Sequence, residues 1–246
     1  MRIDELMAQV SGVDSWQPIR AFQSKRNVVS LVRAYTSPGV AELFVAKAYR
    51  DMEGPTGREA ALLQLLYEQR AAVPRLIHAC DGGLVLQYLP GPTVLSEMLR
   101  LERKGHRGDR GEAATLAFKL CEWLATFYRA MREHSGRSCV FGDMHLRNFI
   151  LHQPSDILHG VDLESCTEGP VEQDIGMLCA HVATYDPALT PWRISFTRCL
   201  LATACRTLAC HPETALRGVR RAIRTIARRR SVSYPREAVE LLSQPF

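Results

Sequence analysis

Three oxygen-bearing side chains at defined spacing constrain this chain most. Asp143 lies in the segment Gly-Asp-Met-His-Leu-Arg-Asn of residues 142–148, five residues before Asn148, and Asp162 follows nineteen residues after Asp143. A carboxylate can orient an attacking hydroxyl and accept its proton, and a carboxylate together with an amide oxygen can hold Mg²⁺. The spacing therefore predicts a phosphoryl-transfer site, with Asp143 as the catalytic carboxylate that accepts the proton and with Asn148 and Asp162 as metal ligands.

The residues between the two predicted metal ligands indicate how they are brought together. An apolar run begins at Asn148, the next segment contains Pro154 and Asp156, and a second apolar run covers residues 157–163. Proline and aspartate favour a chain reversal between two strands. Such a hairpin would place Asn148 and Asp162 at the same end, where both could face one metal ion.

A lysine in an apolar strand predicts a buried ion pair nearer the N-terminus. Lys47 interrupts the apolar residues 43–49, and a lone lysine there is costly unless it is paired. Glu59, near the start of a helix expected over residues 58–66, is the candidate partner. An alternative stays open, because Thr56 and Glu59 have the spacing of a helix capping box.

These five residues, in this order, resemble the eukaryotic-like kinase fold. The motifs Gly-Asp-x-His-x-x-Asn and Asp-Leu-Glu are most similar to the aminoglycoside phosphotransferase branch, which includes choline, sugar and other small-molecule kinases. The likeness runs from residue 19 to residue 185, and its catalytic segment is more specific than its flanks.

The resemblance implies an α+β fold with two lobes and the use of ATP and Mg²⁺. Residues 1–89 would form a small nucleotide-binding lobe around an antiparallel sheet, and residues 90–246 a mainly helical catalytic lobe. Lys47 would contact the nucleotide phosphates. The segment 83–91 resembles the hinge between the lobes, where the backbone of Gln87 and Leu89 would bind adenine.

Three further polar residues receive structural interpretations. Asp174 resembles the acid that begins a helix and braces the catalytic loop through backbone amides. His145 lies inside the catalytic motif, and we interpret it as a loop-stabilising imidazole. Glu164, in the Asp-Leu-Glu motif, is interpreted as a structural hydrogen-bond acceptor rather than a second base.

The sequence departs from the family pattern at three motifs. No glycine-rich loop is present, because the turn at residues 24–27 is Ser-Lys-Arg-Asn, although Lys25 and Arg26 could supply charge for phosphates. Phe141 stands where many kinases have histidine. Asp-Leu-Glu replaces Asp-Phe-Gly and no Ala-Pro-Glu follows, which argues against the activation loop of a protein kinase.

Composition agrees with a globular protein. The chain has 246 residues, 46% of them hydrophobic and 23% charged. This length accommodates one two-lobed domain or two small domains. Its eight cysteines contain no Cys-x-x-Cys pair, so we expect reduced thiols rather than a zinc site or a disulfide framework. No run of eighteen apolar residues occurs and acids lie near the N-terminus, so we expect a cytoplasmic protein without a transmembrane segment.

The spacing of apolar residues predicts that the second half of the chain is mainly helical. The segment 111–134 places apolar residues on one helical stripe, and further helices are expected over residues 171–185 and 191–210. The charged segment 101–110 is expected to be an exposed connector. Little length remains for insertions that would enclose an acceptor, so we expect an open acceptor groove.

The C-terminal region is strongly basic. Between Thr214 and Arg236 the chain contains no acid, and its apolar residues lie opposite the arginines of an amphipathic helix. Two interpretations stay open, a packed helix with a solvated outer face and a surface for an anionic membrane, RNA or a phosphorylated acceptor. No aromatic residues interleave with the basic ones to favour RNA. The outward-facing arginines are Arg217, Arg220, Arg221, Arg224 and Arg228.

The working hypothesis is an ATP- and Mg²⁺-dependent phosphotransferase acting on a hydroxyl of a small molecule or glycan. Two alternatives are a small atypical Ser/Thr protein kinase and a kinase-like binding module with weak catalysis.

Overall fold

The computed structural model describes the chain except for residues 25, 37–38, 51–55, 106–109 and 243–246. The chain divides into two compact units. The first comprises Met1–Pro90 and Val161–Glu164, and the second comprises Gly91–Gly160 and Ser165–Phe246. The first unit therefore also contains a short segment that follows the catalytic motif of residues 142–148 in the sequence. That segment carries Asp162.

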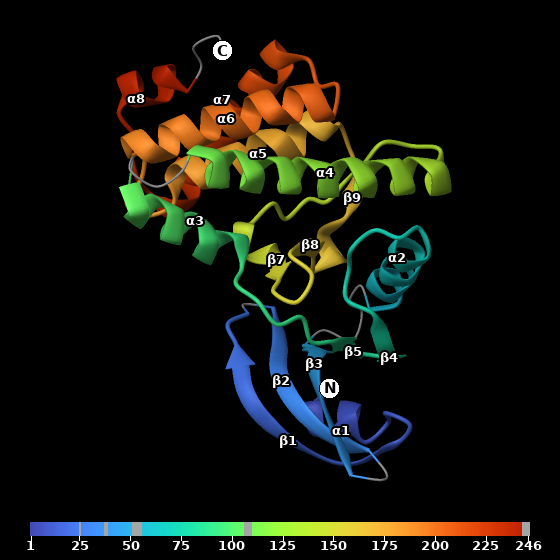
Figure 1. Ribbon diagram of the computed structural model, residues 1–246. Helices are drawn as coiled ribbons and strands as arrows, with labels where there is room; N and C mark the ends of the chain where they lie inside the picture. The colour runs from blue at the N-terminus through green and yellow to red at the C-terminus, as the bar shows by residue number, and fades with distance from the viewer. Residues whose placement is uncertain (25, 37–38, 51–55, 106–109, 243–246) are drawn as a thin grey trace. The chain divides into compact units, whose positions relative to one another are not determined.

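The first unit is built on one antiparallel sheet of five strands in the order β1-β2-β3-β5-β4 (Figure 1). Helix α1 (Ile3–Met7) precedes the sheet, and α2 (Thr56–Glu68) connects β3 to β4. Apolar and β-branched residues dominate the central strands, as expected for strands that pair on both sides. The strands are β1 (Val13–Phe22), β2 (Asn27–Thr36), β3 (Val40–Tyr49), β4 (Leu76–Cys80) and β5 (Gly83–Gln87).

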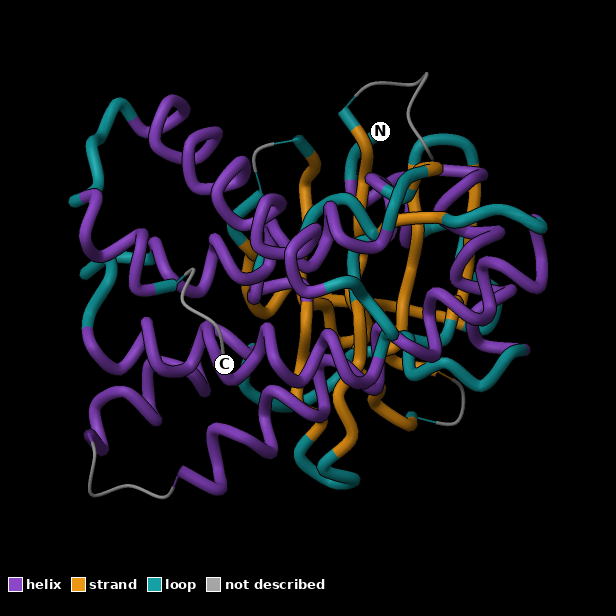
Figure 2. Tube along the Cα trace, turned by 90° about the horizontal axis from the view of Figure 1, so that it is seen from above, coloured by secondary structure: helices purple, strands orange, loops and turns teal. Residues whose placement is uncertain are grey.

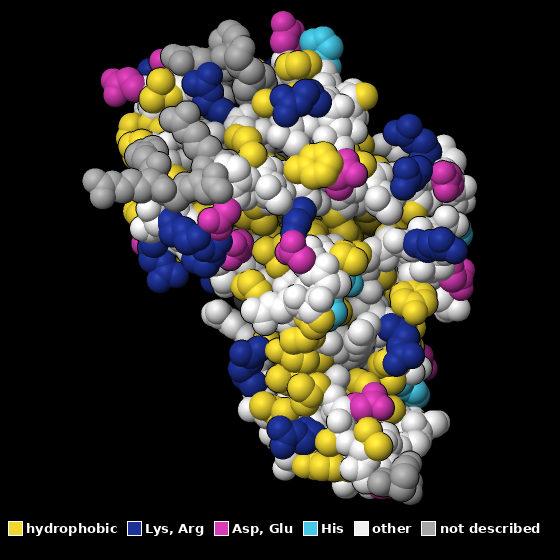
Figure 3. Space-filling model, viewed as in Figure 1, with side chains coloured by type: hydrophobic (Ala, Val, Ile, Leu, Met, Phe, Trp, Pro, Cys, Tyr) yellow, Lys and Arg dark blue, Asp and Glu magenta, His cyan; other side chains and the backbone are white. Residues whose placement is uncertain are grey.

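Helix α1 covers the core of this sheet. Leu6 and Met7 are buried together with sheet residues that include Val32, Phe44 and Val85. Gly83 allows this close packing, because a Cβ there would come within 2.7 Å of the Leu6 side chain. Other apolar side chains of the sheet are exposed, and hydrophobic side chains gather over this unit, low in Figure 3. The exposed ones are Ile19, Val28, Val40 and Leu43.

The second unit is mainly helical. Its helices are drawn in purple in Figure 2 together with those of the first unit, and its short strands form two pairs, β6 with β9 and β7 with β8. The helices are α3 (Val94–Lys104), α4 (Arg110–Ser135), α5 (Val171–Thr184), α6 (Pro191–Thr207), α7 (Pro212–Arg230) and α8 (Arg236–Leu241). The strands are β6 (Cys139–Val140), β7 (Phe149–His152), β8 (Ile157–Gly160) and β9 (Thr167–Glu168). None of the described helices combines the length and hydropathy needed to cross a bilayer.

The core of the second unit forms around α4. Its predicted apolar stripe is buried, and Trp123 and Phe127 stack with ring centroids 5.5 Å apart. Helices α5 and α7 approach closely, because a Cβ on Gly176 would lie 2.5 Å from the backbone of Gly218. Small residues at this crossing let the two backbones meet, and α7 is thereby fixed to the core through its apolar face.

The prediction of an exposed connector over residues 101–110 is wrong for its described part. Helix α3 continues to Lys104, and Leu101 is buried with Val94 and Met98 on one face of that helix. The many charges on the opposite face concealed this apolar spacing in the sequence. Residues 106–109 of the predicted connector lie outside the described residues.

Two predicted helices of the second unit are present. The helices expected over residues 171–185 and 191–210 are α5 and α6, although α6 ends three residues early. The five-stranded antiparallel sheet followed by a mainly helical part confirms the predicted α+β architecture.

Candidate functional site

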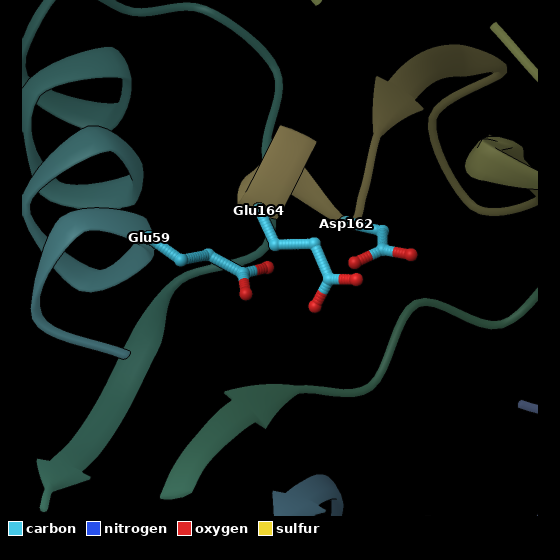
Figure 4. A group of neighbouring side chains, drawn as sticks. All are labelled: Glu59, Asp162 and Glu164. Carbon is cyan, nitrogen blue, oxygen red and sulfur yellow. The ribbon is translucent and has the colours of Figure 1, made fainter. Parts of the chain in front are cut away.

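Lys47 lies at the centre of a buried cluster of charges in the first unit. Its side chain, on β3, is 7% exposed, and its Nζ atom donates to Glu59 Oε2 at 2.8 Å and to Asp162 Oδ1 at 2.6 Å. The same Nζ lies 3.1 Å from Glu164 Oε2. Figure 4 shows Glu59 reaching from α2 toward Glu164 and Asp162, which lie close together after β8. We call these four residues the Lys47 cluster.

The charges of the cluster keep Lys47 protonated. Burial by itself would lower the pKa of the Lys47 ammonium, but the carboxylates of Glu59 and Asp162 outweigh it and raise that pKa above its ordinary value. The backbone of Lys47 is held by both neighbouring strands, since it pairs with Val29 of β2 and Leu84 of β5. The cation therefore has a fixed position and a fixed charge.

Glu59 is the most enclosed acid of the cluster. Its side chain is 1% exposed, its Oε2 accepts hydrogen bonds from Lys47 and from the Tyr49 hydroxyl, and its Oε1 accepts the Leu163 N–H at 3.2 Å. The predicted ion pair between Lys47 and Glu59 is thus confirmed. The side chain of Thr56, the partner in the alternative capping box, lies outside the described side chains.

Glu164 connects the cluster to the turn before β2. Its Oε2 accepts a hydrogen bond from the Asn27 side chain at 2.8 Å, and its Oε1 lies 3.8 Å from the guanidinium of Arg26. The interpretation of Glu164 as a structural acceptor agrees with these contacts. Asn27 was not singled out in the sequence, and Lys25, the other predicted phosphate-binding residue of this turn, lies outside the described residues.

The three acids of the cluster also form a possible cation site. Carboxylate oxygens of Glu59, Asp162 and Glu164 lie within 4.8 Å of one another. The ammonium of Lys47 offsets only one of these three negative charges, and a metal ion would approach through the acid that solvent reaches. That acid is Asp162, whose side chain is 36% exposed and whose backbone has the left-handed φ of 67°.

Asp174 organises the catalytic segment in the second unit. It lies in the first turn of α5, where its carboxylate accepts the N–H groups of Phe141 at 2.6 Å and Gly142 at 3.1 Å and the Tyr128 hydroxyl at 2.9 Å. The predicted brace through backbone amides is confirmed, whereas the contribution of Tyr128 was not predicted. Burial raises the pKa of Asp174, and these hydrogen bonds oppose that rise by favouring the charged form.

The two residues whose N–H groups reach Asp174 are themselves held in place by backbone geometry and packing. Gly142 has a φ of 85°, and a Cβ there would lie 2.3 Å from the Ser165 carbonyl oxygen, so only glycine fits. Phe141 is fully buried and stacks on Phe149 with ring centroids 5.5 Å apart. The aromatic residue that replaces the usual histidine therefore belongs to the core.

Asp143 and Asn148 are linked through the loop backbone. The Asp143 carbonyl oxygen accepts the His145 N–H at 2.9 Å and the Asn148 Nδ2 at 3.0 Å. Because the Asn148 amide nitrogen is used within the loop, its Oδ1 atom is the one left to act as a ligand. The Asp143 side chain is 41% exposed, as a group that must meet an acceptor should be.

His145 lies among polar and aromatic groups of the same unit. Its ring lies against that of His181, tilted by 34° with centroids 4.0 Å apart. Its Nδ1 is 3.2 Å from the Tyr185 hydroxyl, and its Nε2 is 3.9 Å from Asp143 Oδ1. Burial, with positive charge from His145, Arg230 and Arg229, lowers the pKa of His181 to about 3. His181 is thus neutral at physiological pH, and these contacts agree with a loop-stabilising role for His145.

The predicted adenine-binding segment continues from the sheet of the first unit. Gln87 ends β5, and its N–H donates to the Arg75 carbonyl at 2.9 Å. The next N–H, of Tyr88, donates to the Leu43 carbonyl at 3.4 Å, and the Leu89 side chain is buried. This segment is therefore fixed to the sheet, and its binding of adenine stays a prediction.

The predicted hairpin before Asp162 is present. Strands β7 and β8 pair antiparallel, with Phe149 opposite Gly160. Asn148 directly precedes this pair, and Asp162 follows Gly160 by two residues. The hairpin therefore explains the nineteen-residue spacing from Asp143 to Asp162 without any insertion.

No family model matches the chain, and no curated protein matches it in sequence. Solved structures do match it, among them an ethanolamine kinase from Plasmodium vivax, with a TM-score of 0.50 and 12% sequence identity. The match covers 85% of this chain and 73% of the ethanolamine kinase. The chain therefore has the protein-kinase-like fold seen in small-molecule kinases, as the resemblance of its motifs predicted.

Proposed function

We propose that the protein is an ATP- and Mg²⁺-dependent phosphotransferase that phosphorylates a hydroxyl of a small molecule or glycan. The observation that carries this proposal is the buried Lys47, paired with Glu59 from a helix and with Asp162 from a strand end, within a protein-kinase-like fold. Kinases use a strand lysine paired with a helix glutamate to hold nucleotide phosphates, and a following aspartate to hold the metal.

The proposed metal ligands fit Mg²⁺ by their chemistry. Asp162 offers a partly exposed carboxylate, and Asn148 offers the amide oxygen that its loop hydrogen bond leaves available. Hard cations such as Mg²⁺ prefer oxygen donors of this kind. When bound, the ion would supply positive charge against the nucleotide phosphates.

The remaining roles follow from exposure and hydrogen bonding. Asp143 would orient the acceptor hydroxyl and take its proton late in the transfer. Lys47 would donate to a phosphate oxygen, for which its ammonium stays charged because of Glu59 and Asp162. The backbone groups of Gln87 and Leu89 would bind the adenine edge.

Two observations bear on the class of acceptor. The matched Plasmodium vivax protein is an ethanolamine kinase, and this chain lacks the Ala-Pro-Glu segment expected of a protein kinase. Both points favour a small hydroxyl compound over a protein. Ethanolamine is therefore one acceptor to test, beside choline, sugars and glycans.

The test is ATP turnover with Mg²⁺ and pooled acceptors, with γ-labelled phosphate traced to its product. Asp162→Ala should abolish transfer, whereas Asp14→Ala, which removes an exposed acid of the same unit, should leave it unchanged. Equal turnover by the wild type and Asp162→Ala would contradict the proposal. Nucleotide binding without turnover on any acceptor would favour a binding module, and label in protein would favour a protein kinase.

A further inference from the structure

Helix α7 presents a row of arginines directly away from the core. At about 100° per residue, its five outward arginines fall within an arc of about 100°. All five are exposed, and the buried residues of the helix, such as Val219 and Ile226, lie on the opposite side. The arginines are Arg217, Arg220, Arg221, Arg224 and Arg228, which we call the arginine row.

Three arginines of this row have no carboxylate partner in the part of the chain that the structure describes. Helix α7 has no acid after Glu213. Within the described part of the chain, no carboxylate oxygen lies within 4.0 Å of Arg221, Arg224 or Arg228. The guanidinium of Arg217 donates to the Thr214 hydroxyl at 2.9 Å, which leaves its charge in place. Like charges one turn apart repel each other, so the row is costly unless an anion neutralises it.

The size and composition of the row indicate an extended anion that carries phosphates. From Arg217 to Arg228 the row spans about 16 Å of helix, which exceeds what one phosphate group can contact. The row contains arginine and no lysine, and the guanidinium group binds phosphate oxygens in pairs. The partner is therefore a surface or chain of phosphates.

Two features favour a membrane surface over nucleic acid. Helix α7 contains no aromatic residue on which exposed bases could stack. Next to the C-terminal end of the row, Val232 is 45% exposed. Apolar side chains beside a basic row suit a lipid interface, whereas phosphates of nucleic acid make no use of them.

The mode of contact is peripheral rather than inserted. The apolar face of α7 is occupied by the core, through Gly218 against Gly176 of α5 and through buried Val219 and Ile223. A helix that enters a bilayer interface needs that face free. Binding would therefore depend mainly on charge. We propose that the arginine row docks the protein on a membrane of anionic phospholipids, with Val232 as a shallow apolar contact.

The experiment measures co-sedimentation with vesicles. The wild type should bind vesicles of phosphatidylcholine with phosphatidylglycerol and release them as salt rises, and it should not bind phosphatidylcholine alone. Each arginine near an anionic surface contributes about fivefold in affinity. The variant with Arg217, Arg221, Arg224 and Arg228 changed to Gln should therefore bind more than about 100-fold more weakly.

A matched variant removes the same charge from other exposed positions. Arg33→Gln, Arg103→Gln, Arg129→Gln and Arg132→Gln together should retain vesicle binding, and circular dichroism should show both quadruple variants folded. If both quadruple variants lost vesicle binding equally, binding would depend on the net charge of the protein and not on the arginine row, which would overturn the proposal. Binding to neutral and anionic vesicles alike would also overturn it.

Val232→Ser separates lipid from nucleic acid. It should weaken vesicle binding several-fold and leave the binding of a single-stranded RNA unchanged. If the wild type binds the RNA more tightly than the vesicles and needs the same arginines for it, the partner is nucleic acid and the membrane proposal is wrong.

Discussion

The Lys47 cluster and the catalytic loop of residues 142–148 place their functional groups in opposite ways. In the cluster, the proposed phosphate-binding cation is itself buried, and three acids of the same unit surround it. In the loop, Asp143 is 41% exposed, and a different residue, the buried Asp174, holds the backbone. In the cluster, a substitution should therefore change activity and stability together. In the loop, the residues that determine activity should differ from those that determine stability.

The largest expected effect is a loss of activity in the loop without a loss of stability. Asp143→Asn should lower the rate of phosphoryl transfer by about a thousandfold, because the amide cannot take the hydroxyl proton. Its melting temperature should equal that of the wild type, since the exposed carboxylate contributes little to packing. Transfer rates and thermal melts of both proteins measure this. A rate within a few-fold of the wild type would remove Asp143 from the proposed mechanism.

Lys47→Met should change both properties together. Without the ammonium, the buried carboxylates lose their counter-charge, so the free energy of unfolding should fall by about 3 to 5 kcal/mol. Urea unfolding measures this fall, and turnover should be lost as well. Adding Glu59→Gln to Lys47→Met should restore part of the stability and none of the turnover. A single variant as stable as the wild type would show that the cluster is more hydrated than its burial indicates.

Asp174→Asn should mainly weaken the fold of the second unit. The amide oxygen can still accept two of the three hydrogen bonds, but the amide nitrogen that replaces the other oxygen cannot accept the third, so stability should fall by about 2 kcal/mol. Tyr128→Phe should cost less, since it removes one donor and leaves the acid paired. Chemical denaturation of the two variants gives both values. Equal losses would place the stabilisation on Tyr128 rather than on the backbone brace.

The two regions were also predictable from the sequence to different degrees. The loop and its brace could be identified because Asp143, Asn148 and Asp174 occur in short motifs with fixed spacing. The ion pair of Lys47 and Glu59 could be inferred because a lysine in an apolar strand needs a counter-charge. Local spacing and the cost of burying charge thus determined most of the candidate residues.

The contacts that were missed lack any local signal. Asn27 and Glu164 are 137 residues apart, and Tyr128 and Asp174 are 46 apart, so only the folded topology brings each pair together. Helix α3 was missed for another reason, because its charged face conceals an apolar face of Val94, Met98 and Leu101.

The smallest effect tests whether the loop region, unlike the Lys47 cluster, is sensitive to mild acid. His181 has a folded-state pKa of about 3, against 6.5 in an unfolded chain. Between these values the unfolded state binds more protons, so stability falls as pH drops below 6.5, by up to about 1.4 kcal/mol per pH unit. His181→Phe, which keeps a ring against His145, should unfold with a shallower dependence on pH. The pH-dependent difference between the two proteins should be small at pH 7.5. Near pH 5.5, the free energy of unfolding of the variant should rise by about 1 kcal/mol relative to that of the wild type. Urea unfolding at both pH values measures the gain, and parallel pH profiles would mean that His181 is protonated in the folded protein and that its neighbours tolerate the charge.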